Sequence, residues 1–501
     1  MKITLREIQL LLVRLSIALL TYPICKILFF IFNHSYFSDV SFGEFLSVLF
    51  FGLRFDISAV ILMNVPFILL HIIPFGFTKK RWWQSILKIV FLIPNSISIL
   101  ANCVDLEYYK YTLKRTTADF FDLFGLGSDI STMLPQYIKD FWYVILIWIA
   151  LTIFIGWLYG KTESEKVSAR ESEIGSPSRF LTFSLSRFLS WLLLNSTLIG
   201  LCIIGFRGGL QLRPIMPINA SEYLSAKNIP LILNTPFTII KTIELETIEE
   251  KKYFSEEELK KIFNPIHVPS PNPVLSEVEA SLAPRSPNVF IIILESFSKE
   301  YTGLGGRKSY TPFLDSLMKE SLVFDNAFAN GKKSIEGIPA ILAGMPSLMN
   351  ESYITSTYCS NQFTSIAGSL GEKGYSSAFF HGGTNGTMGF DAFCGSSGFD
   401  KYHGRSEYNN EKDYDGDWGI WDDKFFQYTE KEVSKMNEPF LAALFTLTSH
   451  HPYGIPEQYK EQFKGGDLPI LKSVEYLDYS LRIFFESASK EKWFDNTLFV
   501  I

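Results

Sequence analysis

Five long apolar stretches in the first 207 residues constrain this chain more than any other feature of its sequence. They lie near 8–31, 45–73, 84–102, 140–159 and 187–206. Each reaches the length of about 20 residues that a helix needs to cross the hydrocarbon core of a bilayer. Hydrophobic residues make up 47% of the 501 residues. The sequence therefore predicts an N-terminal bundle of five transmembrane helices over 1–207, followed by a globular part.

The basic residues around these stretches predict the orientation of the bundle. Lys2 and Arg6 precede the first stretch, whereas the loop 34–43 after it contains no Lys or Arg. The loops after the second and fourth stretches carry Lys79, Lys80, Arg81, Lys161, Lys166, Arg170 and Arg179. Because cytoplasmic loops are enriched in Lys and Arg, we expect a multi-pass protein of the inner (cytoplasmic) membrane with a cytoplasmic N-terminus. Everything after Arg207 is then extracytoplasmic (periplasmic).

Two ionisable residues, Arg54 and Asp56, lie within the second stretch. Charges at that depth are costly and are often functional. The alternative is a structural ion pair between helices or a pair near a helix end, and both interpretations stay open.

A linker is expected over 208–287, where the chain changes from apolar to mixed composition. Ser255 and Glu258 fit a capping box at the start of a short helix. Residues 264–287 are rich in Pro, Ser and Asn, which predicts an extended tether and a domain boundary near 287. The net charge of −6 gives no support for nucleic-acid binding.

Four apolar runs in the last third of the chain predict an α/β domain with a mostly parallel sheet. They cover 288–294, 375–380, 439–446 and 497–501, and helical patterns at 311–321, 363–373 and 470–489 separate them. Glu295, His381 and His450 follow the first three runs. Ligands of open parallel sheets bind beyond the carboxyl ends of the strands, so these side chains predict a site at that edge.

Ser334 opens an apolar helical pattern and allows two interpretations. Serine is a favoured N-cap. Alternatively Ser334 is a nucleophile, because a helix N-terminus stabilises phosphate and alkoxide and a metal or a base can activate a hydroxyl. Glu295 is the candidate metal ligand beside it. The neighbouring Lys333 either holds an anionic head group or is simply solvated.

The motifs of this region resemble those of a known family. Asn288–Ser296, Thr311–Leu314, Phe324–Phe328, Gly331–Pro339, Phe380–Gly382 and Thr448–Tyr453 resemble the lipoteichoic acid synthase group of the sulfatase/alkaline phosphatase superfamily. The five-span N-terminus and the segment 207–214 share in the resemblance. It implies a sulfatase-like catalytic domain over 288–501 and a divalent metal, Mn²⁺ or Mg²⁺, with Zn²⁺ as in phosphoethanolamine transferase relatives.

The resemblance also implies residue roles and a reaction. Glu295 and Ser334 would bind the metal, and Ser334 would replace the threonine nucleophile of the family. His381, His450 and Lys333 would contact substrate. The implied enzyme is a transferase that moves phosphoglycerol from a membrane phospholipid, such as phosphatidylglycerol, through a covalent phosphoserine to a glycan or polymer acceptor of the cell envelope.

Three departures from the family bear on these expectations. Met388 and Phe390 stand where lipoteichoic acid synthases have Trp and Arg, so the head-group pocket is changed. The sequence after Ser334 lacks the Pro and Arg that formylglycine sulfatases need, which argues against that chemistry. The Asp-His metal ligands of the family follow the strand that ends at Ile501. We therefore expect a catalytic domain that is incomplete at its C-terminus and a fragment without activity.

Other functions and sites remain open. The alternatives are a phosphoethanolamine transferase, a hydrolase of the superfamily, or a metal-free pseudoenzyme that senses lipid. A Cys359–Cys394 disulfide is possible in an oxidising compartment. The acidic cluster around Trp418 lacks the closing Glu of a calcium loop, which favours a surface loop over a second metal site; its members are Asp413, Asp415, Asp417, Asp422 and Asp423.

Overall fold

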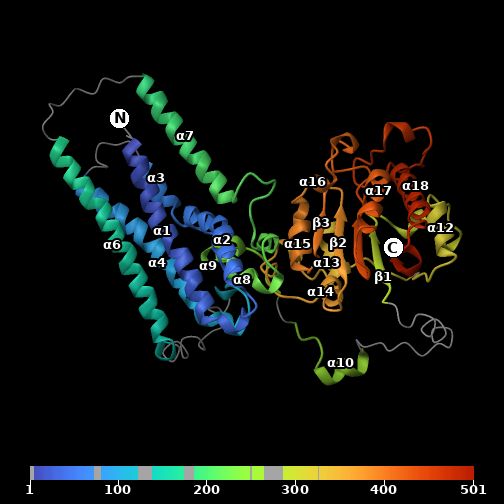
Figure 1. Cartoon of the computed structure of the whole chain (residues 1–501), viewed down its shortest axis with the longest axis horizontal. Helices are drawn as coiled ribbons and strands as arrows, with labels where there is room; N and C mark the ends of the chain where they lie inside the picture. The colour runs from blue at the N-terminus through green and yellow to red at the C-terminus, as the bar shows by residue number, and fades with distance from the viewer. Residues whose placement is uncertain are drawn as a thin grey trace. The chain divides into compact units, whose positions relative to one another are not determined.

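The computed structural model describes residues 5–72, 80–121, 138–173, 185–248, 251–263, 286–324 and 326–501. These residues form two compact units (Figure 1). The first comprises Met1–Glu246 with Tyr353–Gln362, and the second comprises Thr247–Ser352 with Phe363–Ile501. Lys79 and Arg179 of the expected basic loops and most of the expected tether at 264–287 lie outside the described residues.

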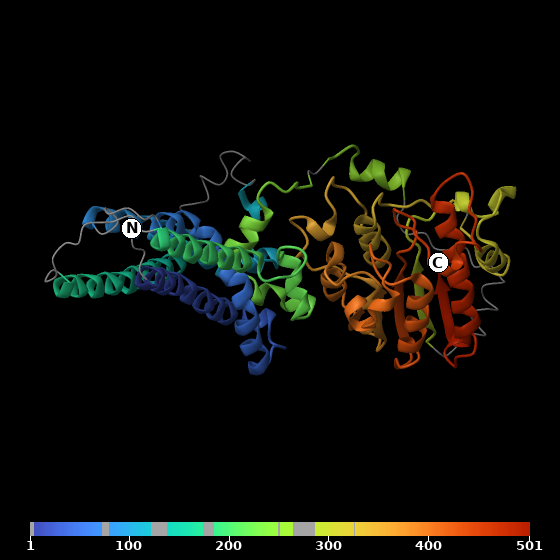
Figure 2. The same ribbon diagram turned by 90° about the horizontal axis from the view of Figure 1, so that it is seen from above.

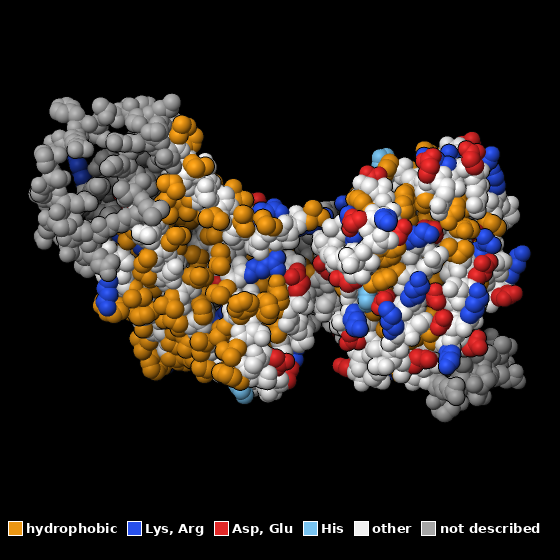
Figure 3. Space-filling model, turned by 45° about the horizontal axis from the view of Figure 1, so that its top comes forward, with side chains coloured by type: hydrophobic (Ala, Val, Ile, Leu, Met, Phe, Trp, Pro, Cys, Tyr) orange, Lys and Arg blue, Asp and Glu red, His pale blue; other side chains and the backbone are white. Residues whose placement is uncertain are grey.

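The first unit is a bundle of apolar helices, as predicted. Its long helices are α1 (Leu5–Phe32), α2 (Phe42–Met63), α3 (Val65–Ile72), α4 (Arg81–Thr112), α6 (Trp142–Glu173) and α7 (Leu185–Arg207). Within the described residues, four helical stretches, in α1, α2, α4 and α6, are long and apolar enough to cross a membrane, and the apolar stretch Leu192–Arg207 in α7 is shorter. Hydrophobic side chains gather on the surface of this unit (Figure 3). The chain is therefore a membrane protein.

The second predicted span is divided into two helices, which the apolar pattern alone did not indicate. Asn64 separates α2 from α3, and Pro66 follows where an amide N–H would be needed to continue the helix. The buried side-chain amides of Asn64 and Asn95 donate to each other's oxygens at 3.1 and 2.8 Å. This amide pair ties the break to α4.

Arg54 and Asp56 bind different partners. Arg54 donates to the Gly208 carbonyl at 2.5 Å and to the Tyr223 hydroxyl at 2.6 Å. Asp56 is fully buried and forms an interhelical ion pair with Lys26, 2.7 Å between Nζ and Oδ1. A second donor, the Asn234 amide, lies 2.8 Å from the same carboxylate.

Residues 208–246 are part of the first unit. They contain the short helices η4 (Pro217–Glu222), η5 (Ala226–Asn228), α8 (Ile229–Ile232) and α9 (Thr235–Thr242). At the start of α9 the backbone N–H of Thr235 donates to Asn102 at 3.1 Å, and its hydroxyl donates to the buried Asp105 at 2.5 Å. Polar side chains of α4 therefore hold this segment inside the bundle.

The second unit contains a five-stranded sheet in which every pairing is parallel. The strands are β1 (Asn288–Ile293), β2 (Ser376–His381), β3 (Lys401–His403), β4 (Phe440–Phe445) and β5 (Thr497–Val500), in the order β3-β2-β4-β1-β5. The predicted parallel α/β fold and all four predicted strands are confirmed. The sequence did not indicate β3, because three residues are too few for a visible pattern.

Helices precede or follow the strands and flank the sheet, with α12 packed against α18 (Figures 1 and 2). They are α12 (Pro312–Met318), α13 (Ser334–Ala343), α14 (Ile366–Gly371), α15 (Phe390–Ser396), α16 (Arg405–Tyr408), α17 (Asp422–Val433) and α18 (Ile470–Ala488), and α10 (Glu256–Ile262) precedes β1. The apolar core under α17 and α18 contains Phe290 and Phe484, whose ring centroids lie 5.3 Å apart. The capping box predicted at Ser255 is present at the start of α10.

Candidate functional site

The carboxyl ends of three neighbouring strands are level in the sheet. Phe445 at the end of β4 pairs with Ile293 of β1 on one side and with His381 of β2 on the other. The chain beyond β1 is fixed to β4, because the Glu295 N–H donates to Thr446 Oγ1 at 2.9 Å and the Thr446 N–H donates to the Ile293 carbonyl at 3.1 Å. The residues that follow these strands therefore share one edge of the sheet.

Glu295 and Ser334 are in direct contact at this edge. The Ser334 hydroxyl donates to Glu295 Oε2 at 2.6 Å, and the Ser296 hydroxyl donates to Oε1 at 2.7 Å. Ser296 has a φ of +52°, a left-handed conformation that is uncommon for residues other than glycine. The carboxylate of Glu295, which is 7% exposed, is thus held by two serine hydroxyls.

Ser334 is the first residue of α13, with Lys333 at the N-cap position. Its hydroxyl bonds to Glu295 instead of capping the helix. The N–H groups of a first helical turn have no partner within the helix and carry a partial positive charge. Ser334 therefore lies where an anion is favoured, and the exposed Lys333 adjoins it in the chain.

A proline in α13 is compensated from outside the helix. Pro339 has no N–H, so the carbonyl of Ile335 four residues before it loses its helical donor. The Ser352 hydroxyl donates to that carbonyl at 2.6 Å. Ser352, which the sequence did not single out, thus stabilises the turn that follows Ser334.

His381 is buried and its ring is enclosed by aromatic side chains. The ring stacks on Phe445, 4.8 Å between centroids, and meets the edge of Phe390 at 5.3 Å. Nδ1 lies 3.4 Å from the Phe445 carbonyl oxygen, and the buried Nε2 has no hydrogen-bond partner among the described residues. Burial lowers the pKa of His381 to about 4, so the imidazole is neutral near pH 7.

His450 is partly exposed and packs on Trp418. The two ring centroids lie 3.8 Å apart. His450 Nδ1 lies 3.0 Å from the carbonyl oxygen of His451, and Trp418 Nε1 donates to the same oxygen at 2.7 Å. In the sequence Trp418 stands only in an acidic loop, and nothing there predicts this contact.

The acidic cluster forms a hairpin over 413–421, termed here the 413–421 hairpin. Asp415 Oδ1 accepts backbone N–H bonds from Asp417, Trp418 and Gly419 at 2.8, 2.8 and 3.0 Å. Asp413 accepts from the Tyr408 hydroxyl at 2.6 Å. These carboxylates therefore hold the loop in shape, which fits the surface loop favoured from the sequence.

Two further aspartates at the start of α17 are buried and hydrogen-bonded. Asp422 accepts the N–H groups of Leu447 and Thr448, both at 3.0 Å, which fixes the chain after β4. Burial raises the pKa of Asp422 to about 6. Asp423 accepts from the Tyr476 hydroxyl at 2.7 Å.

The described residues provide only part of the ligand set that the implied divalent metal needs. Carboxylate and hydroxyl oxygens, as in Glu295 and Ser334, suit Mg²⁺ and Mn²⁺. The described residues contain no group of three or more His, Cys, Asp or Glu side chains placed to hold a metal. Two oxygen donors are too few for a tightly held cation, so the described residues alone do not make a metal site.

The disulfide considered from the sequence is not formed. Cys359 and Cys394 are both buried free thiols. Burial raises the pKa of Cys359 to about 12, which keeps the thiol protonated and unreactive at neutral pH.

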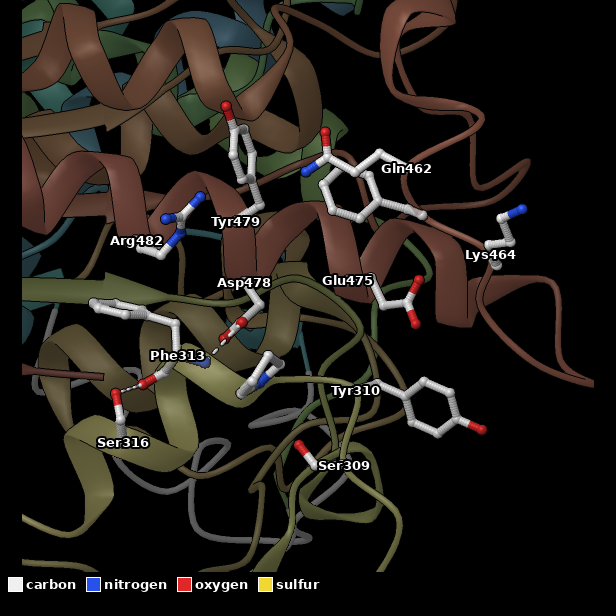
Figure 4. Close-up of a pocket in the computed structure, with 12 residues that line it drawn as sticks. Ser309, Tyr310, Phe313, Ser316, Gln462, Lys464, Glu475, Asp478, Tyr479 and Arg482 are labelled. Atoms are coloured by element: carbon white, nitrogen blue, oxygen red, sulfur yellow. Dashed lines mark hydrogen bonds between the residues drawn. The ribbon is translucent and has the colours of Figure 1, made fainter.

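A cavity of about 640 Å³ opens between α12 and α18, lined by Tyr310, Phe313 and Tyr479 among others (Figure 4). None of the sequence-predicted site residues lines it. Its two carboxylates support backbone: Asp478 accepts the N–H groups of Phe313 and Leu314 at 2.9 and 2.8 Å, and Glu475 accepts that of Gly465 at 2.8 Å. Neither Ser334 nor Glu295 lines this cavity.

Comparison with known proteins matches the second half of the chain. Residues 287–501 match the Sulfatase family model. Over 288 residues the chain is 28% identical to the lipoteichoic acid synthase of Staphylococcus aureus (strain USA300). The aligned region covers 53% of this chain and 42% of the relative. It is 26% identical over 226 residues to the lipoteichoic acid synthase-like YvgJ of Bacillus subtilis (strain 168), covering 42% and 36%. The chain thus spans less than half the length of these relatives.

Two solved structures overlap part of the chain. A protein of the alkaline phosphatase superfamily from Vibrio parahaemolyticus is 31% identical, with a TM-score of 0.41 and coverage of 43% of this chain and 53% of that one. The lipoteichoic acid synthase LtaP from Listeria monocytogenes is 23% identical, with a TM-score of 0.37 and coverage of 42% and 54%. Both overlaps are partial.

Proposed function

Since residues 287–501 match the Sulfatase family model, we propose that this membrane protein is a phosphotransferase. It transfers phosphoglycerol, or a related phospholipid head group, from a membrane phospholipid to a glycan or polymer acceptor of the cell envelope. The curated relatives named lipoteichoic acid synthases support this class of reaction. The catalytic domain is extracytoplasmic in this proposal, in agreement with the distribution of Lys and Arg.

One observation carries the proposal: the hydroxyl of Ser334 is held by Glu295 at the N-terminus of α13. A serine hydroxyl is a weak nucleophile until a neighbouring group activates it. The hydrogen bond of 2.6 Å orients the hydroxyl and gives its proton an acceptor. The helix N-terminus favours the negative charge that develops on a phosphoryl group.

The reaction has two displacements. Ser334 Oγ attacks the phosphorus of the donor lipid, its proton passes to Glu295, the Oγ–P bond forms and the P–O bond to diacylglycerol breaks. Glu295 passes this proton through solvent water to the departing oxygen, and diacylglycerol leaves. An acceptor hydroxyl then attacks the phosphorus and its proton passes to Glu295; the new O–P bond forms, the Oγ–P bond breaks, and Ser334 Oγ takes the proton back from Glu295.

A divalent cation belongs to this proposal, Mn²⁺ or Mg²⁺ in the first place and Zn²⁺ in the second. When bound, such an ion supplies electrostatic stabilisation of phosphate charge. Among the described residues, Glu295 and Ser334 would hold this ion together with ligands from elsewhere. His381, His450 and Lys333 are proposed to contact the head group, whose identity is set by a pocket with Phe390 in place of a cation.

The proposal is tested with the protein expressed from the gene read to its natural stop codon, purified in detergent with added Mn²⁺. Fluorescent phosphatidylglycerol and phosphatidylethanolamine are supplied in parallel, and released diacylglycerol is measured. Ser334→Ala should abolish release, Ser334→Thr should retain part of it, and Ser321→Ala, an exposed serine in the same unit, should match the wild type. Mass spectrometry without acceptor should find the head group on the Ser334 peptide.

A metal-free lipid sensor is the second candidate, favoured by the incomplete metal ligand set among the described residues. The same assay separates the two. Release from one lipid that depends on Ser334 identifies the donor and supports the transferase. Absence of release from both lipids, with no metal retained on the protein, contradicts it and supports the sensor.

A further inference from the structure

The 413–421 hairpin joins the two chain segments that follow β2 and β4. Its own strands are held together by the Asp415 N–H to Gly419 carbonyl bond at 2.9 Å and the Trp421 N–H to Asp413 carbonyl bond at 3.0 Å. It is fixed to the segment after His381 by a bridge between Gly383 and Gly419. A Cβ at Gly419 would collide with the Gly382 carbonyl, so this close approach requires glycine there.

The tip of the hairpin presents Trp418 in a fixed position. Asp415 accepts three successive N–H groups, including that of Trp418 at 2.8 Å. The indole ring then packs on His450 with centroids 3.8 Å apart, and its Nε1 donates to the His451 carbonyl oxygen at 2.7 Å. Backbone and side chain of Trp418 are thus both anchored, and His450 lies against the anchored ring.

The His451 carbonyl determines which nitrogen of His450 carries a proton. A carbonyl oxygen only accepts hydrogen bonds, and it lies 3.0 Å from His450 Nδ1. Nδ1 must therefore donate, and in the neutral imidazole Nε2 then bears the lone pair. Trp418 stabilises this arrangement twice, because it packs on the ring and also bonds to the oxygen that Nδ1 uses.

We propose that Trp418 is a positioning residue for His450: it holds the imidazole in the tautomer with a proton on Nδ1. Nε2 is then the nitrogen that accepts a hydrogen bond from a hydroxyl of a polyol or glycan substrate. This role in substrate binding rests on the proposed transferase function, whereas the tautomer follows from the geometry of the hairpin alone. Asp415 of the acidic cluster contributes to this role, because it accepts the Trp418 N–H and so orients that residue.

The test reads the tautomer directly. The full-length chain is labelled with ¹⁵N-histidine, and long-range ¹H–¹⁵N spectra are recorded in detergent micelles above pH 8, with His450→Asn used to assign the signals. The wild type should show His450 protonated on Nδ1. Trp418→Ala should shift it toward the Nε2-protonated form that free histidine prefers. Asp417→Ala, an exposed neighbour in the hairpin, should leave it unchanged.

Kinetics provide the second measurement. Trp418→Ala should raise KM for the acceptor by about fivefold or more with a smaller change in kcat, because it weakens a ground-state contact. Trp418→Phe keeps a ring on His450 and should restore the Nδ1 tautomer and most of the affinity. Unchanged His450 signals in Trp418→Ala, or an Nε2-protonated wild type, overturn the inference. A wild type without transferase activity refutes the proposed function instead, and the spectra still decide the tautomer.

Discussion

The proline in α13 leads to a sharp prediction about Ser352. The Ser352 hydroxyl supplies the hydrogen bond that Pro339 denies to the Ile335 carbonyl, at 2.6 Å. Ser352→Ala leaves this carbonyl without that donor, and an unsatisfied, partly buried acceptor costs about 1–2 kcal/mol. We therefore expect the free energy of unfolding of the second unit to fall by about that amount.

Pro339→Ala provides the decisive comparison. Alanine restores an N–H four residues after Ile335, so the helix can satisfy its own carbonyl. The cost of Ser352→Ala should then shrink to a few tenths of a kcal/mol, which gives a coupling energy of about 1 kcal/mol between the two positions. Ser352→Thr, which retains a hydroxyl, should resemble the wild type.

The assay is pulse proteolysis of the full-length chain in detergent across a urea series. A C-terminal tag reports how much of the second unit survives at each concentration. The cycle compares wild type, both single variants and the double variant. If the two substitutions are additive within error, Ser352 does not compensate for the proline and the reasoning about α13 is refuted.

Three further predictions concern buried charge and the candidate site. Lys26→Met leaves the buried Asp56 without its cation and should lower the free energy of unfolding in SDS by about 3–5 kcal/mol. Adding Asp56→Asn should recover much of this loss, and no recovery would contradict the pairing. The pKa of His381 is about 4 in the folded state, below its unfolded value of about 6.5, so the unfolded chain binds the proton first. Stability should therefore fall by about 3 kcal/mol as pH drops from 6.5 to 4, and equal pH slopes in wild type and His381→Gln would contradict this. Glu295→Gln should reduce diacylglycerol release by about a hundredfold or more with little change in Tm, and near-normal release would exclude Glu295 from the chemistry.

The features that could be predicted from the sequence are those set by local composition. A continuous apolar run identifies a strand buried on both faces, so 288–294 corresponds to β1 (Asn288–Ile293) and 439–446 to β4 (Phe440–Phe445). The start of α13 at Ser334 was likewise visible, because the apolar pattern begins there. The division of the second span at Asn64 was not predicted. Pro66 marks the position, but it stands within a continuous hydrophobic stretch that indicates a single span.

Two of the contacts that were missed join residues far apart in the chain. Glu295 is fixed by Thr446, and His450 by Trp418. Neither Thr446 nor Trp418 stands in a local pattern that predicts its contact, and the order of the strands brings the pairs together. Because β4 lies between β1 and β2, the segment after β4 reaches both neighbouring strand ends. Supporting residues for a site at this edge are therefore to be sought after the central strand, and Thr446 and His450 both lie there.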